Sequence, residues 1–430
     1  MPLLRSALAT LLLVLVPAMP ASAQERWIES WGTALPLMPP PPSPFGDAPP
    51  PQDSEAPPQA VPSPFVPHPA KFEDQTIRMI VRTSTGGERF RLEFANAAGT
   101  DAVTFGSVHA ALAAAEGAIM PGTDRAVTFG GKEGLVLHPG AKAVSDPIEL
   151  MLPALTDVAV SIHLPQATPA NTVDALALKP AFIVDGDKTA EPTLDRPLVV
   201  DSYFWLKGLS VPAASEEAGT IVALGDSITE GYATTSGANA SWPDVLAERL
   251  QDDPELSDWG VVNVGISGNR ILKNGVGDAT IARFGDDVLA RPGVKWIIVL
   301  EGINDINMSI MPGMPQEQAV TADAIIAGLD QLVARAHLHG IKVAGGTILP
   351  TKGLFFYSAE GEAMRQAVNA WIRSSGRFDA VIDFDAATRD PVDPFRLLPR
   401  IDPGDHVHPN DAGNRLMADA IDLEIFKPEE

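Results

Sequence analysis

The sequence predicts two domains of different class. The first is an all-β domain of the sandwich or jelly-roll type over residues 70–212, and the second is an α/β domain with a three-layer, mostly parallel sheet over residues 213–430. Polar and apolar residues alternate in 88–94 and 158–164, as they do in half-buried strands. After residue 220, short apolar runs alternate with amphipathic helical stretches, an order typical of parallel strands joined by crossover helices.

In the first domain, the alternation gathers apolar side chains on one face of each strand. Such faces are formed by Phe90, Leu92 and Phe94, and by Val158, Val160, Ile162 and Leu164. Shorter strands are expected at 76–85, 126–129, 135–137 and 181–184, separated by Gly, Pro and Asp turns, and one strand candidate at 27–33 lies ahead of this domain, before the Pro-rich segment. This pattern favours antiparallel sheets. His109, His138 and His163 are scattered through the domain without metal-ligand spacing, so we expect surface or half-buried positions for them.

In the second domain, turn and cap signals delimit the elements. A helix is expected after Ser241, with Pro243 in its first turn, and Gly340 should end the clearest helix, at 321–339. The remaining expected elements are strands at 221–224, 261–264, 295–300, 341–348 and 380–384, and helices at 360–374 and after Asn410. In a parallel sheet of this kind, Ser227, Gly268 and Asn304 all fall at carboxyl ends of strands, where such sheets bind ligands.

Two segments precede these domains. Residues 1–23 have a positive start, a short apolar core and the small residues Ala21, Ser22 and Ala23, which predicts a signal peptide cleaved near Ala23 and an exported, periplasmic or extracellular protein. Residues 24–69 begin with a strand candidate. Their segment 36–69 contains 15 prolines, so an irregular loop is expected there.

Composition excludes several classes of function. The 430 residues include no cysteine, which rules out disulfides, thiol nucleophiles and thiolate metal sites. The formal charge of −24, from 55 acidic and 31 basic residues, opposes nucleic acid and anionic membranes as partners. No stretch beyond the signal segment has the roughly 20 apolar residues of a membrane helix, so no integral membrane segment is expected in the mature protein.

The candidate nucleophile is Ser227, in the stretch Ile-Val-Ala-Leu-Gly-Asp-Ser that ends a buried strand. A serine there needs a neutral imidazole and a carboxylate to activate it. Asp405 and His408, three apart on one turn, can supply both. His406 is a competing base, but we prefer His408, because neighbours closer to Asp405 in sequence are poorly placed for a clamped pair.

Two further stretches have features of an oxyanion hole. Gly268 lies in a loop after an apolar strand, and its amide can approach a substrate because it has no side chain. Asn304 follows the next strand, and its side-chain amide is a neutral donor. The alternative is that Gly268 only forms a turn and Asn304 only satisfies local backbone groups.

Four motifs resemble, in their order along about residues 218–425, the four blocks of the SGNH (GDSL-type) hydrolases. They are Gly-Asp-Ser, the glycine loop, Gly-Ile-Asn-Asp and Asp-x-x-His. The resemblance implies a catalytic triad of Ser227, Asp405 and His408. It also implies an oxyanion hole formed by the amides of Ser227 and Gly268 and by Asn304, with no cofactor or metal. The first block has Ile where the family has Leu, and the chain contains no Gly-x-Ser-x-Gly elbow of ordinary α/β hydrolases.

The sequence therefore favours a secreted carboxylic ester hydrolase that acts through an acyl-enzyme. Its expected partners are small-molecule or polysaccharide esters, with acetyl or other short acyl groups on carbohydrates as the preferred class. A lipase or lysophospholipase type of lipid esterase is the first alternative. A peptidase or amidase on the same machinery, and an inactive carbohydrate-binding envelope protein, are the others.

Overall fold

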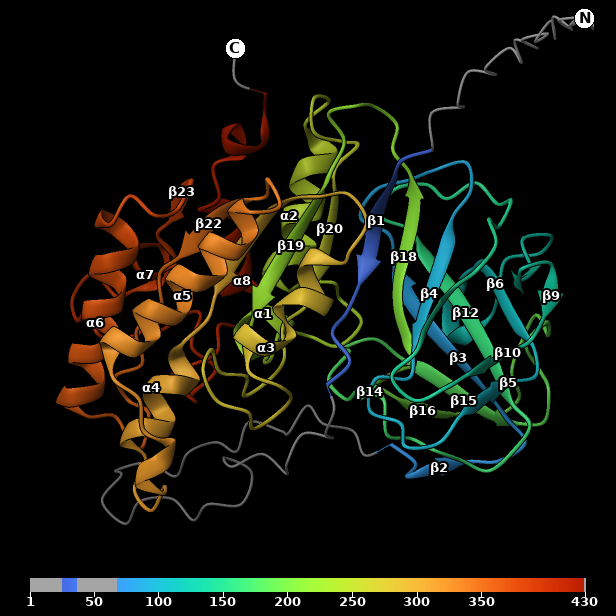
Figure 1. The fold of residues 1–430 in the computed structure, drawn as a ribbon, viewed down its shortest axis with the longest axis horizontal. Coiled ribbons are helices and arrows are strands. Elements are labelled where there is room, and N and C mark those ends of the chain that lie inside the picture. Colours follow the sequence, from blue (N-terminus) through green and yellow to red (C-terminus); the bar gives the residue numbers. More distant parts are fainter. Residues whose placement is uncertain (1–24, 37–67, 429–430) are drawn as a thin grey trace, which may run out of the picture.

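A computed structural model describes residues 25–36 and 68–428. These residues form a β-rich part and a helix-rich part, which lie beside each other in Figure 1. The predicted signal segment 1–23 and residues 37–67 of the Pro-rich segment lie outside the described residues. Within the described residues, no helix is long and apolar enough to cross a membrane.

The β-rich part contains two large antiparallel sheets, as predicted. The four-stranded sheet has the order β1 (Trp27–Gly32), β18 (Leu206–Pro212), β4 (Arg91–Ala95), β11 (Lys142–Val144). The six-stranded sheet has the order β16 (Leu198–Val200), β15 (Ala181–Asp185), β3 (Gln75–Arg82), β12 (Asp157–Leu164), β6 (Val108–Leu112), β7 (Arg125–Ala126). The small two-stranded sheets pair β10 (Leu135–Leu137) with β5 (Val103–Phe105), β13 (Thr168–Pro169) with β2 (Lys71–Phe72), β14 (Val173–Asp174) with β17 (Tyr203–Phe204), and β8 (Thr128–Phe129) with β9 (Lys132–Glu133).

One apolar core lies between the two large sheets. The predicted inward faces, Phe90 to Phe94 from the first sheet and Val158 to Leu164 from the second, are buried in the same cluster. The cluster also takes Trp205 and Phe72, whose rings pack edge to face. The alternation in the sequence therefore predicted the core of this part correctly, because each strand presents one face to the opposite sheet.

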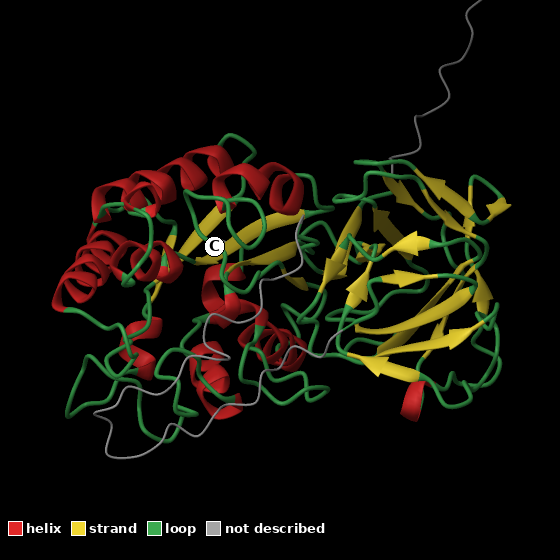
Figure 2. Ribbon diagram, turned by 90° about the horizontal axis from the view of Figure 1, so that it is seen from below, coloured by secondary structure: helices red, strands yellow, loops and turns green. Residues whose placement is uncertain are grey.

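The helix-rich part is built on a parallel sheet, which confirms the predicted α/β class. The strand order is β20 (Gly260–Asn263), β19 (Thr220–Gly225), β21 (Val294–Leu300), β22 (Lys342–Gly346), β23 (Ala380–Ile382). Helices lie on both sides of this sheet in Figure 2. They are α1 (Ser227–Glu230), α2 (Trp242–Asp252), α3 (Thr280–Phe284), α4 (Ile303–Ile310), α5 (Ala322–His337), α6 (Ala359–Ser374), α7 (Phe384–Thr388) and α8 (Asp411–Asp419).

Polar caps start the helices at the predicted positions. The Ser241 side chain caps α2, and the Asn410 side chain accepts a hydrogen bond from the N–H of Gly413 at the start of α8. Helix α5 is followed by Gly340, whose φ of +68° is a left-handed conformation that glycine adopts without strain. Local chemistry thus fixes where these helices begin and end.

Strand β1 joins the two parts. It pairs with β18 of the β-rich sheet, although the sequence had grouped it with the Pro-rich segment. On its other side, β1 lies against β20, the edge strand of the parallel sheet. A Cβ atom on Gly260 would lie 2.0 Å from the carbonyl oxygen of Glu29, so only glycine permits this approach. The N–H of Glu29 also donates to Thr220 Oγ1 at 2.8 Å.

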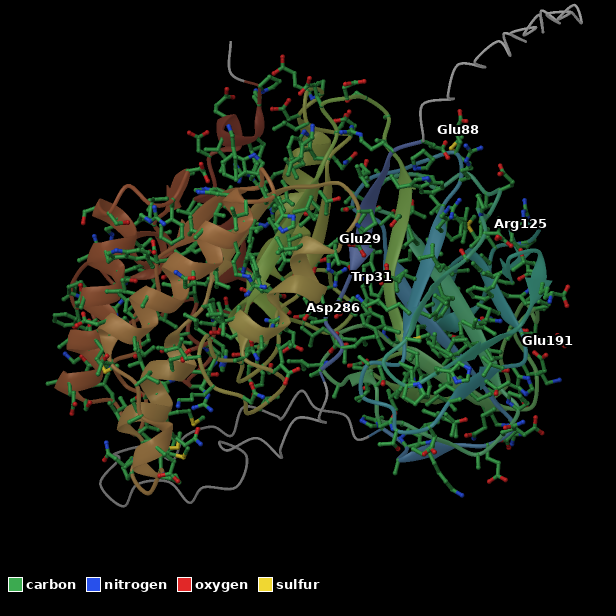
Figure 3. The ribbon with its side chains drawn as sticks, viewed as in Figure 1. Glu29, Trp31, Glu88, Arg125, Glu191 and Asp286 are labelled. Atoms are coloured by element: carbon green, nitrogen blue, oxygen red, sulfur yellow. The ribbon has the colours of Figure 1, made fainter. Side chains whose placement is uncertain are left out.

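A buried ion pair lies at this junction. Glu29 and Arg291 are 2.7 Å apart and both side chains are 2% exposed. Arg291 also donates to the carbonyl oxygens of Thr33 at 2.6 Å and Asp287 at 2.5 Å. Figure 3 shows Glu29, Trp31 and Asp286 gathered between the two parts. Each of the three guanidinium nitrogens of Arg291 thus donates one hydrogen bond, which helps the buried arginine to be tolerated. Burial outweighs the attraction of Arg291 at Glu29 and raises the pKa of its carboxyl to about 7.

The first prediction concerns this ion pair. Arg291→Leu should lower the free energy of unfolding by about 3 to 5 kcal/mol, because it leaves Glu29 and two carbonyl groups buried without their partner. Urea unfolding followed by tryptophan fluorescence measures the loss. As a matched control, Arg377→Leu removes an exposed ion pair with Asp330 and should cost less than about 1 kcal/mol. Equal effects of the two substitutions would contradict the prediction.

Candidate active site

The turn after β19 presents Ser227. A Cβ atom on Gly225 would lie 2.5 Å from the carbonyl oxygen of Leu300 and 2.2 Å from Thr229 Oγ1, so the strand can end in this tight turn only with glycine. Asp226 then caps α1, its Oδ1 accepting from the N–H of Ile228 at 3.0 Å. Ser227 is therefore the first residue of a short helix and is 7% exposed.

The structure brings Ser227, His408 and Asp405 into one hydrogen-bonded chain. Ser227 Oγ and His408 Nε2 are 2.8 Å apart, and His408 Nδ1 and Asp405 Oδ2 are 2.7 Å apart. Asp405 Oδ1 accepts from the N–H groups of Val407 and His408, each at 3.0 Å. Burial alone would raise the pKa of Asp405, but the His408 imidazole and these N–H groups outweigh it and lower the pKa. The carboxylate is thus held in its charged form against the imidazole.

The ring of Tyr232 covers His408. The two ring centroids are 4.2 Å apart at an angle of 36°. His408 is only 6% exposed. The imidazole is consequently fixed from two directions, by a carboxylate at Nδ1 and by an aromatic face, with Nε2 directed at the serine.

His406 has a different partner. Its Nδ1 is 2.6 Å from Asp402 Oδ2, and its N–H donates to Asp402 Oδ1 at 3.1 Å. The hydrogen bond to Asp402 raises the pKa of His406. Its backbone has a φ of +63°, and its ring packs against Gly353, where a Cβ would lie 2.6 Å from the imidazole. Two Asp–His pairs therefore occur side by side, and the pair with His408 is the one that reaches Ser227.

The two other predicted donors, Gly268 and Asn304, follow the two strands that flank β19. Gly268 follows β20 with a φ of +79°, and Asn304 lies in the first turn of α4, directly after β21. Because β19 runs between β20 and β21, both residues are at the same sheet edge as Ser227. Asn304 Nδ2 donates to the carbonyl oxygen of Asn269 at 3.0 Å, which ties the two loops together. An amide NH₂ group has a second hydrogen that remains for a ligand.

Buried acids behind the nucleophile were not predicted. Burial raises the pKa of Asp226 to about 7 and that of Asp305 to about 6, and burial next to Asp226 raises the pKa of Glu301 well above its usual value. Asp305 accepts from the N–H of Ile271 at 2.7 Å and so anchors the loop that carries Gly268. Asp226 and Asp305 lie within the Gly-Asp-Ser and Gly-Ile-Asn-Asp motifs, but the sequence gives no signal of how deeply they are buried.

Arg283 is the cation among these acids. Its guanidinium donates to the carbonyl oxygen of Gly225 at 3.1 Å, to that of Val264 at 2.8 Å and to Asn269 Oδ1 at 3.0 Å. It thereby links the nucleophile turn to the Gly268 loop. No motif in the sequence marks Arg283. In the described part of the chain, no group of three or more His, Asp or Glu side chains is arranged to hold a metal ion.

The fold and the hydrogen-bonded serine, histidine and aspartate are those of a hydrolase of the three-layer α/β class. Residues 223–416 match the model of the GDSL-like Lipase/Acylhydrolase family. This match supports a carboxylic ester hydrolase. A comparison with curated proteins found no match.

Solved structures of similar proteins cover about half of the chain. The acetylxylan esterase of Geobacillus stearothermophilus is 26% identical, over 49% of this chain and 95% of that one, with a TM-score of 0.38. An α/β hydrolase from the metagenome of Lake Arreo, Spain, is 21% identical, over 48% of this chain and 94% of that one, with a TM-score of 0.39.

The second prediction separates the two histidines. His408→Ala should abolish ester turnover, because only His408 Nε2 lies within hydrogen-bond distance of Ser227 Oγ. His406→Ala should retain most of the turnover. The initial rate on a p-nitrophenyl ester checks both, with circular dichroism as the control for folding. An inactive His406→Ala next to an active His408→Ala would move the base to His406.

Proposed function

We propose that the protein is a serine ester hydrolase that acts through an acyl-enzyme, with Ser227, His408 and Asp405 as its catalytic triad. The observation that carries the proposal is the continuous chain of hydrogen bonds from Asp405 through His408 to Ser227. The preferred substrates are acetyl and other short acyl esters, among them esters of carbohydrates. The proposal includes export, with the signal segment removed near Ala23, which the mass of the secreted protein would test.

In the first half of the reaction, Ser227 Oγ attacks the ester carbonyl carbon while its proton passes to His408 Nε2. The Asp405 carboxylate supports the imidazolium that forms. Negative charge develops on the carbonyl oxygen, and we assign the N–H groups of Ser227 and Gly268, with Asn304 Nδ2, as the donors that stabilise it. Collapse of this intermediate breaks the bond to the leaving alcohol, which takes the proton from His408.

The second half repeats these steps with water. His408, again neutral, takes a proton from the water molecule that attacks the acyl-enzyme carbonyl. The oxyanion is bound by the same three donors. When the bond to Ser227 Oγ breaks, the proton returns to the serine and the carboxylic acid leaves. No cofactor enters this cycle.

The carbohydrate preference rests on the β-rich domain that precedes the hydrolase domain, an argument by analogy at the level of domain architecture. A lipid esterase is the second candidate, and the exposed apolar side chains near the site favour it. Phe355 is 54% and Phe395 39% exposed, and the neighbouring Leu354 and Phe356 pack on Val407, next to His408. Relative rates on acetylated polysaccharides and triacylglycerols distinguish these two candidates.

The third prediction tests the covalent route. Ser227→Ala should keep the fold and lower turnover of p-nitrophenyl acetate by several orders of magnitude, because only binding and the oxyanion donors remain. Turnover is measured on purified protein, with circular dichroism to verify folding. Near-native rates in the variant would exclude the acyl-enzyme, and a wild-type protein without turnover would favour an inactive carbohydrate-binding protein.

The fourth prediction concerns Asn304. Asn304→Ala should lower kcat by roughly a hundredfold or more with a smaller change in KM, because the donor acts on charge that appears in the transition state. Steady-state kinetics on the same ester give both constants. A change confined to KM would make Asn304 a substrate-positioning residue instead.

A further inference from the structure

A loop of the β-rich part reaches the active site. Strand β14 ends at Asp174, and residues 174–178 then run along the nucleophile helix of the neighbouring part. Asp174 is buried, and its Oδ2 accepts from Thr33 Oγ1 at 2.6 Å while its Oδ1 accepts from the N–H of Leu176 at 3.0 Å. These two hydrogen bonds fix the orientation of the Asp174 carboxyl group.

Asp174 faces a second carboxyl group across the junction. Glu230 is the last residue of α1, three residues after Ser227, and its carboxyl lines the same small cavity as that of Asp174. Two neighbouring carboxyl groups can form a hydrogen bond only when one of them carries a proton. Such a bond agrees with the direction in which each group shifts the pKa of the other. Burial, together with the Asp174 carboxylate, raises the pKa of Glu230 well above its usual value. Burial also raises the pKa of Asp174, to about 6, and the larger rise at Glu230 favours Glu230 as the donor and Asp174 as the acceptor.

The other oxygen of Glu230 binds the loop that carries Gly268. Glu230 Oε2 accepts from the N–H of Ser267 at 2.7 Å and also from the Ser267 hydroxyl. Ser267 directly precedes Gly268, whose N–H is one of the three proposed oxyanion donors. The carboxyl of Glu230 therefore bridges Asp174 of the β-rich part and the backbone next to an oxyanion donor.

The same loop also supports the base. Leu176 and Leu178 form a small apolar cluster with Tyr232, the residue whose ring covers His408. The carbonyl oxygen of Leu178 accepts from the N–H of Gly237 at 2.8 Å, which holds the loop against the segment after α1. One loop thus contacts both supports of the site, Glu230 behind the oxyanion donors and Tyr232 over the imidazole.

We infer that Asp174 and Glu230 are positioning residues, through which the β-rich part sets the geometry of the oxyanion hole. The inference rests on the proposed function, since it assigns these residues a role in the same hydrolysis. Neither residue touches the reacting atoms. They act through Ser267 on the orientation of the Gly268 N–H, and a displacement of such a donor by even an ångström costs catalysis.

Other charged groups surround this pair. Arg283 of α3 acts on Glu230 through its charge, and a cavity of about 90 Å³ next to the pair is lined by Arg82, Lys179 and Asp244. A cavity of this size and polarity has room for water. The raised pKa of Glu230 extends its protonated form to higher pH than in an ordinary glutamic acid, and the proton is lost as the pH rises further. On its loss two carboxylates face each other, and the bridge weakens.

The test compares kcat and KM for p-nitrophenyl acetate in five proteins. Glu230→Ala and Asp174→Ala should each lower kcat by about tenfold to a hundredfold with KM nearly unchanged, because a displaced donor acts on the transition state. Glu230→Gln should stay near the wild-type kcat, since its amide oxygen can accept from Ser267 and its NH₂ can donate to Asp174. The matched control is Asp146→Ala, which removes an aspartate bonded only within the β-rich part, to Thr128, Gly130 and Gly131, and should leave kcat unchanged.

The dependence of kcat on pH is a second test, because residues with only a structural role would not change it. Wild-type kcat should decline on the alkaline side as the shared proton leaves, and Glu230→Gln, whose bridge needs no proton, should lack that decline. A folded Asp174→Ala with wild-type kcat would overturn the inference, and so would a Glu230→Gln as impaired as Glu230→Ala. If Glu230→Ala does not fold, the comparison of Asp174→Ala with Asp146→Ala decides. A wild-type protein without turnover would instead refute the proposed function.

Discussion

The hydrogen bond between Ser227 and His408 imposes the main constraint on this fold, because its two residues are 181 positions apart. It forms only when the closing helix α8 is docked on α2. Asn414 of α8 forms hydrogen bonds to both sides of this contact. Its Oδ1 accepts from the N–H of Trp242 at 2.9 Å, and its Nδ2 donates to the carbonyl oxygen of Pro409, next to His408, at 2.8 Å. The start of the first long helix and the histidine turn are therefore joined through one buried amide.

Charge around the nucleophile is controlled by burial. The chain carries a net charge of −24, yet the acids behind Ser227 have raised pKa values because they are out of water. The raised pKa values extend to higher pH the protonated forms, which add no negative charge at the place where an oxyanion would develop. Asp405 has the opposite environment, with a lowered pKa. The site thus contains carboxyl groups with raised pKa values and one with a lowered pKa. The hydrogen bond from His408 is a partner that Asp405 has and the other acids lack.

Local signals predicted much of this structure. The alternation around Phe90 and Val160 marked the inner faces of two sheets, and Ser241 and Asn410 marked helix starts, because these signals act over a few residues. The triad could be proposed since the order of its blocks is written along the chain. The Glu29–Arg291 pair and the Asp174–Glu230 bridge had no such signal. Their partners are distant in sequence, and only the folded arrangement makes them neighbours. The left-handed backbone of His406 was also missed, because the residue type gives no signal for it.

The junction through β1 bears on how such a protein can change over evolutionary time. Strand β1 completes a sheet in one part while Glu29 supplies the counter-charge for Arg291 in the other. A recombination event that moved the GDSL-like domain alone would separate Arg291 from Glu29 and from the carbonyl oxygen of Thr33. The two parts are therefore expected to be inherited together as one unit. Exchange between relatives would have to carry the amino-terminal strand along with Ser227, which lies nearly 200 positions later, and with His408, which lies nearly 380 positions later.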